Sequence, residues 1–383
     1  MIAFLLVIAQ VATPSLEIAP ATGEALAQAK TVIAKGVGFL IETQNADGSW
    51  GGSRKPMIYD RFWTFPETHR SWQIATTGLA VMTLMDLPDD ANARAAVDHG
   101  IDYITNGARL KRPTGWDSDN TWGYIYGFAA LVKAAQDERL GAGSRKIAIE
   151  AKGKELMQQM WDYQAPNGGW AYYAMETEAA RPSWGTSFMT GVAVLAILDA
   201  KQLGWEIEEK RLRAGIRAIE HCRLPDGSYT YSVNPISVWS AGTGIDRVRG
   251  SLSRIQVCNL ALARANDAGY ETSVTTADLK EGLALLFREH HYLDIARGRP
   301  RPHEAYHYNS GYFYYFGHYY AGYVLERLGP SAWDQFLPPL VHSIAKTQSP
   351  DGAMIDFFMN DYGRPYGVAY GVGALMRATT SAP

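Results

Sequence analysis

Cysteine is scarce in this chain, with Cys222 and Cys258 the only two among 383 residues. Two thiols cannot form the framework of a small disulfide-rich domain, nor a zinc site with four thiolate ligands. A surplus of charge is also lacking, because 36 Lys and Arg residues stand against 39 Asp and Glu residues. The composition gives no sign of a basic surface for nucleic acid, and we expect no nucleic-acid partner.

Long apolar runs are missing except at the N-terminus. Residues 2–12 (IAFLLVIAQVA) are too few to span a bilayer, which takes about 20 apolar residues, but they fit the apolar core of a secretory signal. We predict a signal peptide and short linker at residues 1–22, a single domain at 23–383, and export to the periplasm or the medium. The alternative is an N-terminal helix that packs on the body. We expect no stable membrane span in the mature chain.

Aromatic residues, in contrast, are abundant, with 22 Tyr, 11 Trp and 12 Phe. Tyr and Trp need a polar partner when they are buried. A chain in which Tyr outnumbers Phe therefore favours aromatic surfaces that touch water, such as the wall of a cavity.

A glycine turn recurs four times, at residues 44–50, 164–170, 223–229 and 348–354. The first residues of these turns are separated by 120, 59 and 125 positions, which are two, one and two units of about sixty residues. Residues 93–107 and 278–293 fall where the two missing units begin, and both have the apolar spacing of a helix. The sequence therefore predicts six units.

Each unit pairs two kinds of helix. The first is amphipathic, as in residues 29–43, and ends at the Asn/Asp-Gly turn. The second is apolar around most of its circumference and rich in small residues, at 71–87, 121–135, 184–200, 253–267, 310–328 and 365–378. We predict an all-α fold, an (α/α)6 toroid in which an outer ring of six helices surrounds an inner ring of six. A linear solenoid is the alternative.

One segment carries a family resemblance, Lys35-Gly36-x-x-Phe39-Leu40-x-x-x-Gln44-x-x-Asp47-Gly48-Ser49-Trp50. It resembles the Gln-Trp repeat of squalene–hopene cyclases, whose fold element also occurs in protein prenyltransferase β subunits and in complement-like thioester domains. Residues 317–321 and 348–352 resemble exported prenyltransferase/squalene-oxidase-repeat proteins. The thioester branch requires Gly-Cys-Gly-Glu-Gln, which neither cysteine provides. The resemblance implies the toroid and only weakly an activity.

The resemblance to class II terpene cyclases implies an acidic Asp that protonates an alkene. The nearest match to the Asp-x-Asp-Asp motif has Asp119 as the proton donor and Asp117 as its helper, but Asn120 takes the fourth position. The alternative is that these residues cap the following helix without chemistry. Aromatic faces would stabilise cations, and the candidates are Trp72, Trp122, Tyr126, Trp184 and Tyr315. Core packing is their alternative role.

A carbohydrate-active enzyme is a second reading, because secreted glycosidases and polysaccharide lyases use the same barrel. Such enzymes need paired carboxylates, or a base with Arg nearby. His318 is the third catalytic candidate, with a hydrogen-bonded core histidine as its alternative. The polar candidates expected at the mouth of the barrel, where every outer-to-inner loop lies, are His69, Arg70, Arg254, His307, Tyr308 and Asp361. Pro300 and Pro302 predict a loop before the fifth inner helix.

The prenyltransferase branch implies zinc held by Asp, Cys and His. Here Cys258 and His318 are present but Gln256 stands at the Asp position, so we expect neither a metal nor another cofactor. Whether Cys222 pairs with Cys258 stays open.

The leading hypothesis is an exported, terpenoid-cyclase-like toroid that binds or transforms an isoprenoid or other hydrophobic ligand. If it is an enzyme, a class II cyclase-like isomerase or lyase is the first expectation. A secreted carbohydrate-active enzyme and a non-catalytic binding or scaffold module are the alternatives. The partner is then a small hydrophobic ligand or a glycan, and the oligomeric state is open.

Overall fold

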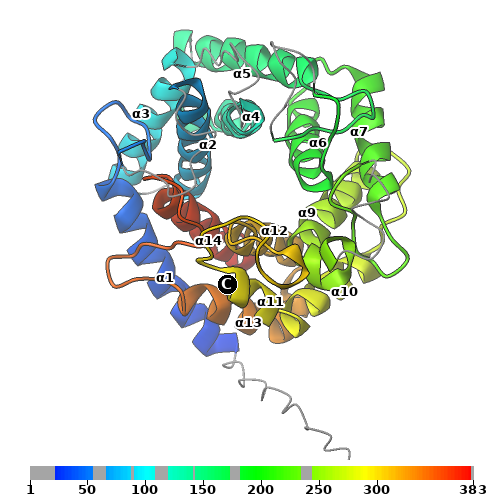
Figure 1. The fold of residues 1–383 in the computed structure, drawn as a ribbon. Helices are drawn as coiled ribbons and strands as arrows, with labels where there is room; N and C mark the ends of the chain where they lie inside the picture. Colours follow the sequence, from blue (N-terminus) through cyan, green and yellow to red (C-terminus); the bar gives the residue numbers. More distant parts are fainter. Residues whose placement is uncertain are drawn as a thin grey trace, which may run out of the picture.

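Helices form two concentric rings in the computed structural model of this chain (Figure 1). The structure describes residues 22–54, 66–87, 90–107, 120–140, 143–172, 182–233 and 244–380. Within these ranges no strand occurs beyond isolated bridges such as that between Trp170 and Thr186. In the described parts of the chain no helix is both long enough and apolar enough to cross a membrane.

The outer ring comprises α1 (Thr22–Glu42), α3 (Ala91–Gly107), α5 (Ser144–Asp162), α7 (Glu209–Cys222), α10 (Thr276–Arg288) and α13 (Trp333–Ala345). The inner ring comprises α2 (Pro66–Leu84), α4 (Asn120–Gln136), α6 (Ser187–Gln202), α9 (Val248–Asp267), α12 (Phe313–Leu328) and α14 (Gly363–Thr379). A short helix, α11 (His291–Ala296), lies in the connection from α10 to α12. The predicted (α/α)6 toroid is confirmed.

The two rings close on themselves, which excludes the linear solenoid. The last inner helix, α14, packs against the first inner helix, α2, and against α1. The last outer helix, α13, also packs against α1, and Figure 1 shows these two helices side by side. The first and last units are therefore neighbours, and the six inner helices surround a common axis.

Burial follows the composition of each helix. Thirteen of the sixteen residues of α6 are buried, because this apolar helix packs against the inner helices α4 and α9 and against the outer helix α7. In α7 a narrow stripe that includes Leu212, Ile216 and Ile219 is buried and the other face is charged. The sequence pattern thus decides which ring a helix joins.

The glutamine that opens the repeat turn joins neighbouring units. Its side-chain Nε2 donates both to a carbonyl inside its own turn and to a carbonyl of the next outer helix. The bonds between units are Gln44 to Ala96 on α3 at 2.8 Å, Gln164 to Arg211 on α7 at 3.0 Å, and Gln348 to Val32 on α1 at 3.0 Å. The fourth turn has Arg223 instead, which forms an ion pair with Asp278 on α10. The Gln348 bond links the last unit to the first.

The turn also seats an aromatic ring on the next outer helix. The indole Nε1 of Trp50 donates to the carbonyl of Leu40, and the ring lies against Gly100 of α3. Trp170 repeats the arrangement against Gly215 of α7. The turn glycine has a positive φ, +88° at Gly168, which a residue with a Cβ rarely adopts. Helix end, turn and neighbouring helix are thus packed as one unit.

Ion pairs connect the inner helices at the end opposite these turns. Lys133 and Arg377, both in the last turns of their helices, share Asp86, at 2.6 Å and 2.9 Å. Further pairs of the same kind are Arg377–Glu326, Arg327–Asp267 and Arg264–Asp199. Cations are favoured at helix C-termini by the backbone dipole. Burial lowers the pKa of Lys133 to about 8, and the charge of Asp86 opposes this shift. At this end of the ring, ion pairs therefore link each of these inner helices to its neighbour.

The glutamine bonds predict a stability cost that a matched surface residue lacks. Gln164 is buried and makes two hydrogen bonds, so Gln164→Ala leaves two carbonyls without their donor. We expect the free energy of unfolding to fall by about 2 kcal/mol. Gln158→Ala removes an exposed bond to Asp162 on α5 and should cost less than about 0.5 kcal/mol. Urea unfolding measures both, and equal losses would contradict the role given to Gln164.

Candidate functional site

Aromatic side chains meet across the axis of the inner ring. Phe188 of α6 contacts Phe316 of α12 at 5.8 Å between ring centroids, although α9 separates these helices in the ring. Tyr126 of α4 contacts Tyr370 of α14 at 6.1 Å, past α2. Tyr126 also approaches Tyr320 on the opposite helix, α12, with 3.4 Å between hydroxyl oxygens. These five side chains form what we call the aromatic floor.

The floor is held by its hydroxyl groups. The Tyr370 hydroxyl donates to the Tyr126 oxygen at 2.6 Å. Burial raises the pKa of Tyr126, Tyr320 and Tyr370 well above the usual value, because a phenolate would be poorly solvated here. The three phenols therefore remain neutral and serve as hydrogen-bond partners within an otherwise apolar layer.

Above the floor, toward the repeat turns, lies a second set of rings. Trp72 stacks on Trp122 with 5.4 Å between centroids, and Trp122 lies over Tyr126 at 5.6 Å with a 7° angle between ring planes. On the other side, Tyr172 contacts Trp184 at 5.7 Å. These rings form the wall of the candidate site. Trp72, Tyr172 and Trp184 are partly exposed, whereas Trp122 is buried beneath Trp72 and belongs to the core.

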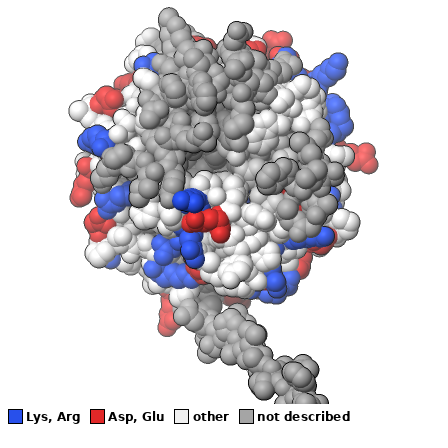
Figure 2. Space-filling model, in the orientation of Figure 1, with Lys and Arg blue, Asp and Glu red and all other residues white. Residues whose placement is uncertain are grey.

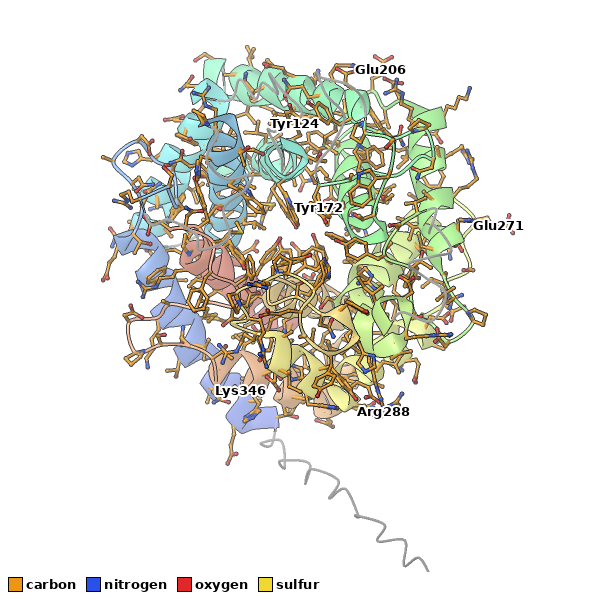
Figure 3. All side chains as sticks on the ribbon, in the orientation of Figure 1. Tyr124, Tyr172, Glu206, Glu271, Arg288 and Lys346 are labelled. Carbon is orange, nitrogen blue, oxygen red and sulfur yellow. The ribbon has the colours of Figure 1, made fainter. Side chains whose placement is uncertain are left out.

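Tyr172 and Tyr231 occupy the same position in two repeats, four residues after the turn glycine. Their hydroxyl oxygens are 2.8 Å apart, and both rings contact Phe188. Figure 3 shows Tyr172 near the middle of the ring, whereas the labelled Glu206 and Arg288 lie at its periphery. Figure 2 likewise shows the charged side chains of this face mostly around its edge. In these two repeats, the turn therefore places a tyrosine in the wall.

The last repeat has Asp356 at this position. Its carboxylate is fully buried and accepts hydrogen bonds from the Tyr366 hydroxyl and from the backbone N–H of Tyr315, in the first turn of α12. Burial raises the pKa of Asp356 to about 7, and the two hydrogen bonds oppose this shift. Asp356 therefore caps α12 from a neighbouring loop and can hold a proton near neutral pH.

Arg254 and His303 lie beside the wall. Arg254 of α9 is 1% exposed, and its guanidinium lies 5.4 Å from the centroid of the Tyr231 ring. The Nδ1 atom of His303 is 2.8 Å from the carbonyl oxygen of Tyr308, so Nδ1 carries the proton and donates. Its Nε2 then accepts from the Tyr312 hydroxyl at 3.1 Å. Burial and the charge of Arg254 lower the pKa of His303, which keeps this ring neutral.

The structure brings together only some of the residues that the sequence suggested. Trp72, Trp122 and Tyr126 belong to the wall and floor. Trp184 contacts Tyr172 of the wall, and Arg254 lies against Tyr231. His69 and Asp361 lie at the edge between α2 and the start of α14, whereas the charge of Arg70 acts on Tyr103 of α3. At this edge the His69 Nδ1 is 3.2 Å from the Tyr362 hydroxyl, and Asp361 forms an ion pair with Arg54 at 3.1 Å.

The other candidates lie elsewhere. His318 points from the inner ring of helices toward the outer one, with its Nε2 2.9 Å from the Nε2 of His290. Burial lowers the pKa of His318 to about 3. Tyr315 donates from its hydroxyl to Thr347, at 2.8 Å. His307 and Tyr308 lie in the loop before α12, both with positive φ, and Tyr308 is 47% exposed. Asp117 and Asp119 lie outside the described residues.

The prenyltransferase positions do not converge. Gln256 bonds to two carbonyls, His318 bonds to His290, and Cys258 and Cys222 are buried free thiols. No group of three or more His, Cys, Asp or Glu side chains that could hold a metal ion occurs in the part of the chain that the structure describes.

Solved structures share this architecture at low sequence identity. A variant of the type II terpene cyclase MstE from Scytonema, in complex with its substrate geranylgeranyl dihydroxybenzoate, is 13% identical with a TM-score of 0.52, covering 94% of this chain and 99% of that one. A possible GH105 family member from Klebsiella pneumoniae is 12% identical with a TM-score of 0.55, covering 98% of each chain. The α-1,6-mannanase GH76A of Salegentibacter is 11% identical with a TM-score of 0.53, covering 93% and 99%.

No protein-family model matches the sequence, and a search of curated proteins finds no match. The chain thus has the α/α toroid fold of terpene cyclases and of GH76 and GH105 proteins. At these identities the similarity establishes the fold and leaves the activity to the site.

The raised pKa of Asp356 predicts a pH-dependent stability of defined sign. The native carboxyl ionises near pH 7 and the unfolded one near pH 4, so the native state holds the extra proton between these values. Raising the pH from about 4 to about 7 should therefore destabilise the wild type relative to Asp356→Asn by roughly 3 kcal/mol. Urea unfolding at both pH values measures this difference.

Asp351, in the repeat turn just before Asp356, provides a control whose stability should change with pH in the opposite direction. The backbone N–H of Ala353 and the guanidinium of Arg364 lower the pKa of Asp351, so its contribution is lost as the pH falls. The wild type should lose stability relative to Asp351→Asn toward acid pH. A flat difference between the wild type and Asp356→Asn would contradict the buried proton.

Proposed function

We propose that this protein binds an isoprenoid-type hydrophobic molecule at the turn end of the inner ring. The observation that carries the proposal is the aromatic floor, on which side chains of α4, α6, α12 and α14 meet across the axis beneath half-buried tryptophans. The architecture it shares with a cyclase that takes a geranylgeranyl substrate supports this choice.

The chemistry of the wall suits a long unsaturated chain. Apolar surface that a ligand removes from water contributes about 25 cal/mol per Å², and the partly exposed rings of Trp72, Tyr172 and Trp184 offer such surface. Their faces also stabilise positive charge. The hydroxyls of Tyr172 and Tyr231 offer hydrogen bonds at the wall. A mostly apolar surface with a few polar groups is typical of small-molecule sites.

Carbohydrate processing is the second candidate, favoured by the partly exposed Tyr172 and Trp184 and by the fold shared with a mannanase. It requires two carboxylates that face the ligand. Among described residues at this end, Asp361 is paired with Arg54 and Asp356 is enclosed by Tyr315 and Tyr366. Asp246 is buried and accepts from the backbone N–H of Tyr231. The hydrophobic ligand therefore remains the stronger proposal.

Loss of a wall tryptophan should weaken binding. We expect Trp72→Ala to reduce the affinity for geranylgeraniol about tenfold, because a stacked ring at the ligand surface is removed. Trp205→Ala is the matched control, since Trp205 packs on Phe128 and on Gly153 of α5, away from the axis. Tryptophan fluorescence titration reports binding to both variants. Equal affinities, or no binding by the wild type, would contradict the proposed site.

For a reaction, we propose Asp119 as the acid. It directly precedes α4, whose third residue, Trp122, is part of the wall. Asp119→Asn should abolish product formation from a geranylgeranyl substrate and leave its binding within about twofold, because the amide cannot supply the proton. Product analysis by mass spectrometry measures turnover. Full activity of Asp119→Asn would show that another group, or none, acts as the acid.

The place of action is proposed to be outside the cytoplasm, on the strength of the apolar run at residues 2–12.

A further inference from the structure

A buried cation lies beside the aromatic wall. Arg254 is 1% exposed, and no other Lys or Arg of the described ranges is buried. Its guanidinium lies 5.4 Å from the centroid of the Tyr231 ring and 5.8 Å from that of Phe313. Both rings contact Phe188, at 5.6 Å and 5.3 Å. The guanidinium therefore adjoins the aromatic side chains that are proposed to hold the hydrophobic ligand.

The hydrogen bonds of Arg254 are incomplete. The guanidinium has five N–H donors. Its Nη2 donates to the carbonyls of Ile245 and Tyr229, whereas its Nε is buried and has no hydrogen-bond partner. A buried charge with an unpaired donor is costly unless a partner completes it. The Nε atoms of Arg145, Arg223 and Arg377 are unpaired too, but these three side chains have carboxylate partners, which Arg254 lacks among the described residues.

The protein itself compensates this charge only in part. Asp246 is 6% exposed and its charge favours the cation, but its Oδ1 accepts from the backbone N–H of Tyr231 at 2.6 Å. No carboxylate among the described residues forms an ion pair with Arg254, although other arginines of the inner helices have one. The neighbouring His303 is neutral, with its Nε2 accepting from Tyr312. Arg254 is therefore a cation that Asp246 favours through its charge but does not hold in a direct ion pair.

We propose that Arg254 binds a carboxylate on the ligand, so that the molecule recognised is an acidic, hydrophobic one. The inference rests on the proposed function and narrows its substrate class. The carboxylate would accept a hydrogen bond from the Nε–H of the guanidinium, beside Tyr231. The apolar chain of the ligand would lie against Phe188 and the floor. A carboxylate fits because arginine presents donors in a planar fork.

The experiment compares ligands that differ only in charge. Affinities for geranylgeranoic acid, its methyl ester and geranylgeraniol are measured with the full chain by fluorescence titration. The wild type should bind the acid at least about tenfold more tightly than the ester or the alcohol. In Arg254→Met, which keeps the side-chain volume, the three affinities should converge, and Arg254→Lys should restore part of the difference. Arg264→Met, on the same helix but paired with Asp199 at the other end, should behave as the wild type.

The outcomes separate the two proposals. If the wild type binds acid, ester and alcohol equally, the hydrophobic site stands and the role of Arg254 is overturned. If it binds none of them but binds a trigalacturonate in a manner that Arg254→Met abolishes, the carboxylate site stands and the isoprenoid is overturned. If nothing binds, both fall. The comparison of acid with ester uses the wild type. Equal affinities for the two would therefore overturn the carboxylate proposal even if Arg254→Met does not fold.

Discussion

One side-chain amide holds this architecture together. An outer helix exposes its charged face to water, so its packing alone does little to fix its angle to the next unit. The Nε2 atoms of Gln44, Gln164 and Gln348 supply that constraint, because each satisfies a carbonyl of its own turn and one of the next outer helix. The Gln348 bond to α1 joins the last unit to the first, where α14 also packs on α1 and α2. The same local contact therefore serves both between successive units and at the closure of the ring.

Closure in turn decides where chemistry is feasible. In an open array the inner helices would present their aromatic faces to water, whereas in a ring those faces oppose each other. The hydroxyls of Tyr126, Tyr320 and Tyr370 then find partners on other helices, which offsets the cost of burying them. At the C-terminal ends of the inner helices, pairs such as Lys133–Asp86 join neighbouring helices. At the turn end, aromatic rings lie beside a few buried polar groups such as Arg254 and Asp356.

The fold could be predicted from the sequence because both of its signals are local. Helical spacing separates the outer helices from the inner ones, and the glycine turn marks the unit length. The wall was predicted in part, since Trp72, Trp122 and Tyr126 lie in the first turns of inner helices. Tyr172 and Tyr231 were both missed, although each lies four residues after the glycine of its turn. A closer alignment of the turns would have found that position.

The direction of a side chain on an inner helix was harder to predict, because an inner helix is buried on every side. Arg254 and His318 both lie in such helices and look equivalent in sequence, but one faces the aromatic wall and the other faces His290 in the outer layer. Hydrogen bonding distinguishes them in space. His318 has a partner at both ring nitrogens, so its burial is explained by the protein alone. Arg254 binds the carbonyls of Ile245 and Tyr229 through Nη2 but keeps an unpaired Nε beside an apolar surface. Burial of an unpaired donor is costly, and a ligand that accepts from Nε would remove this cost.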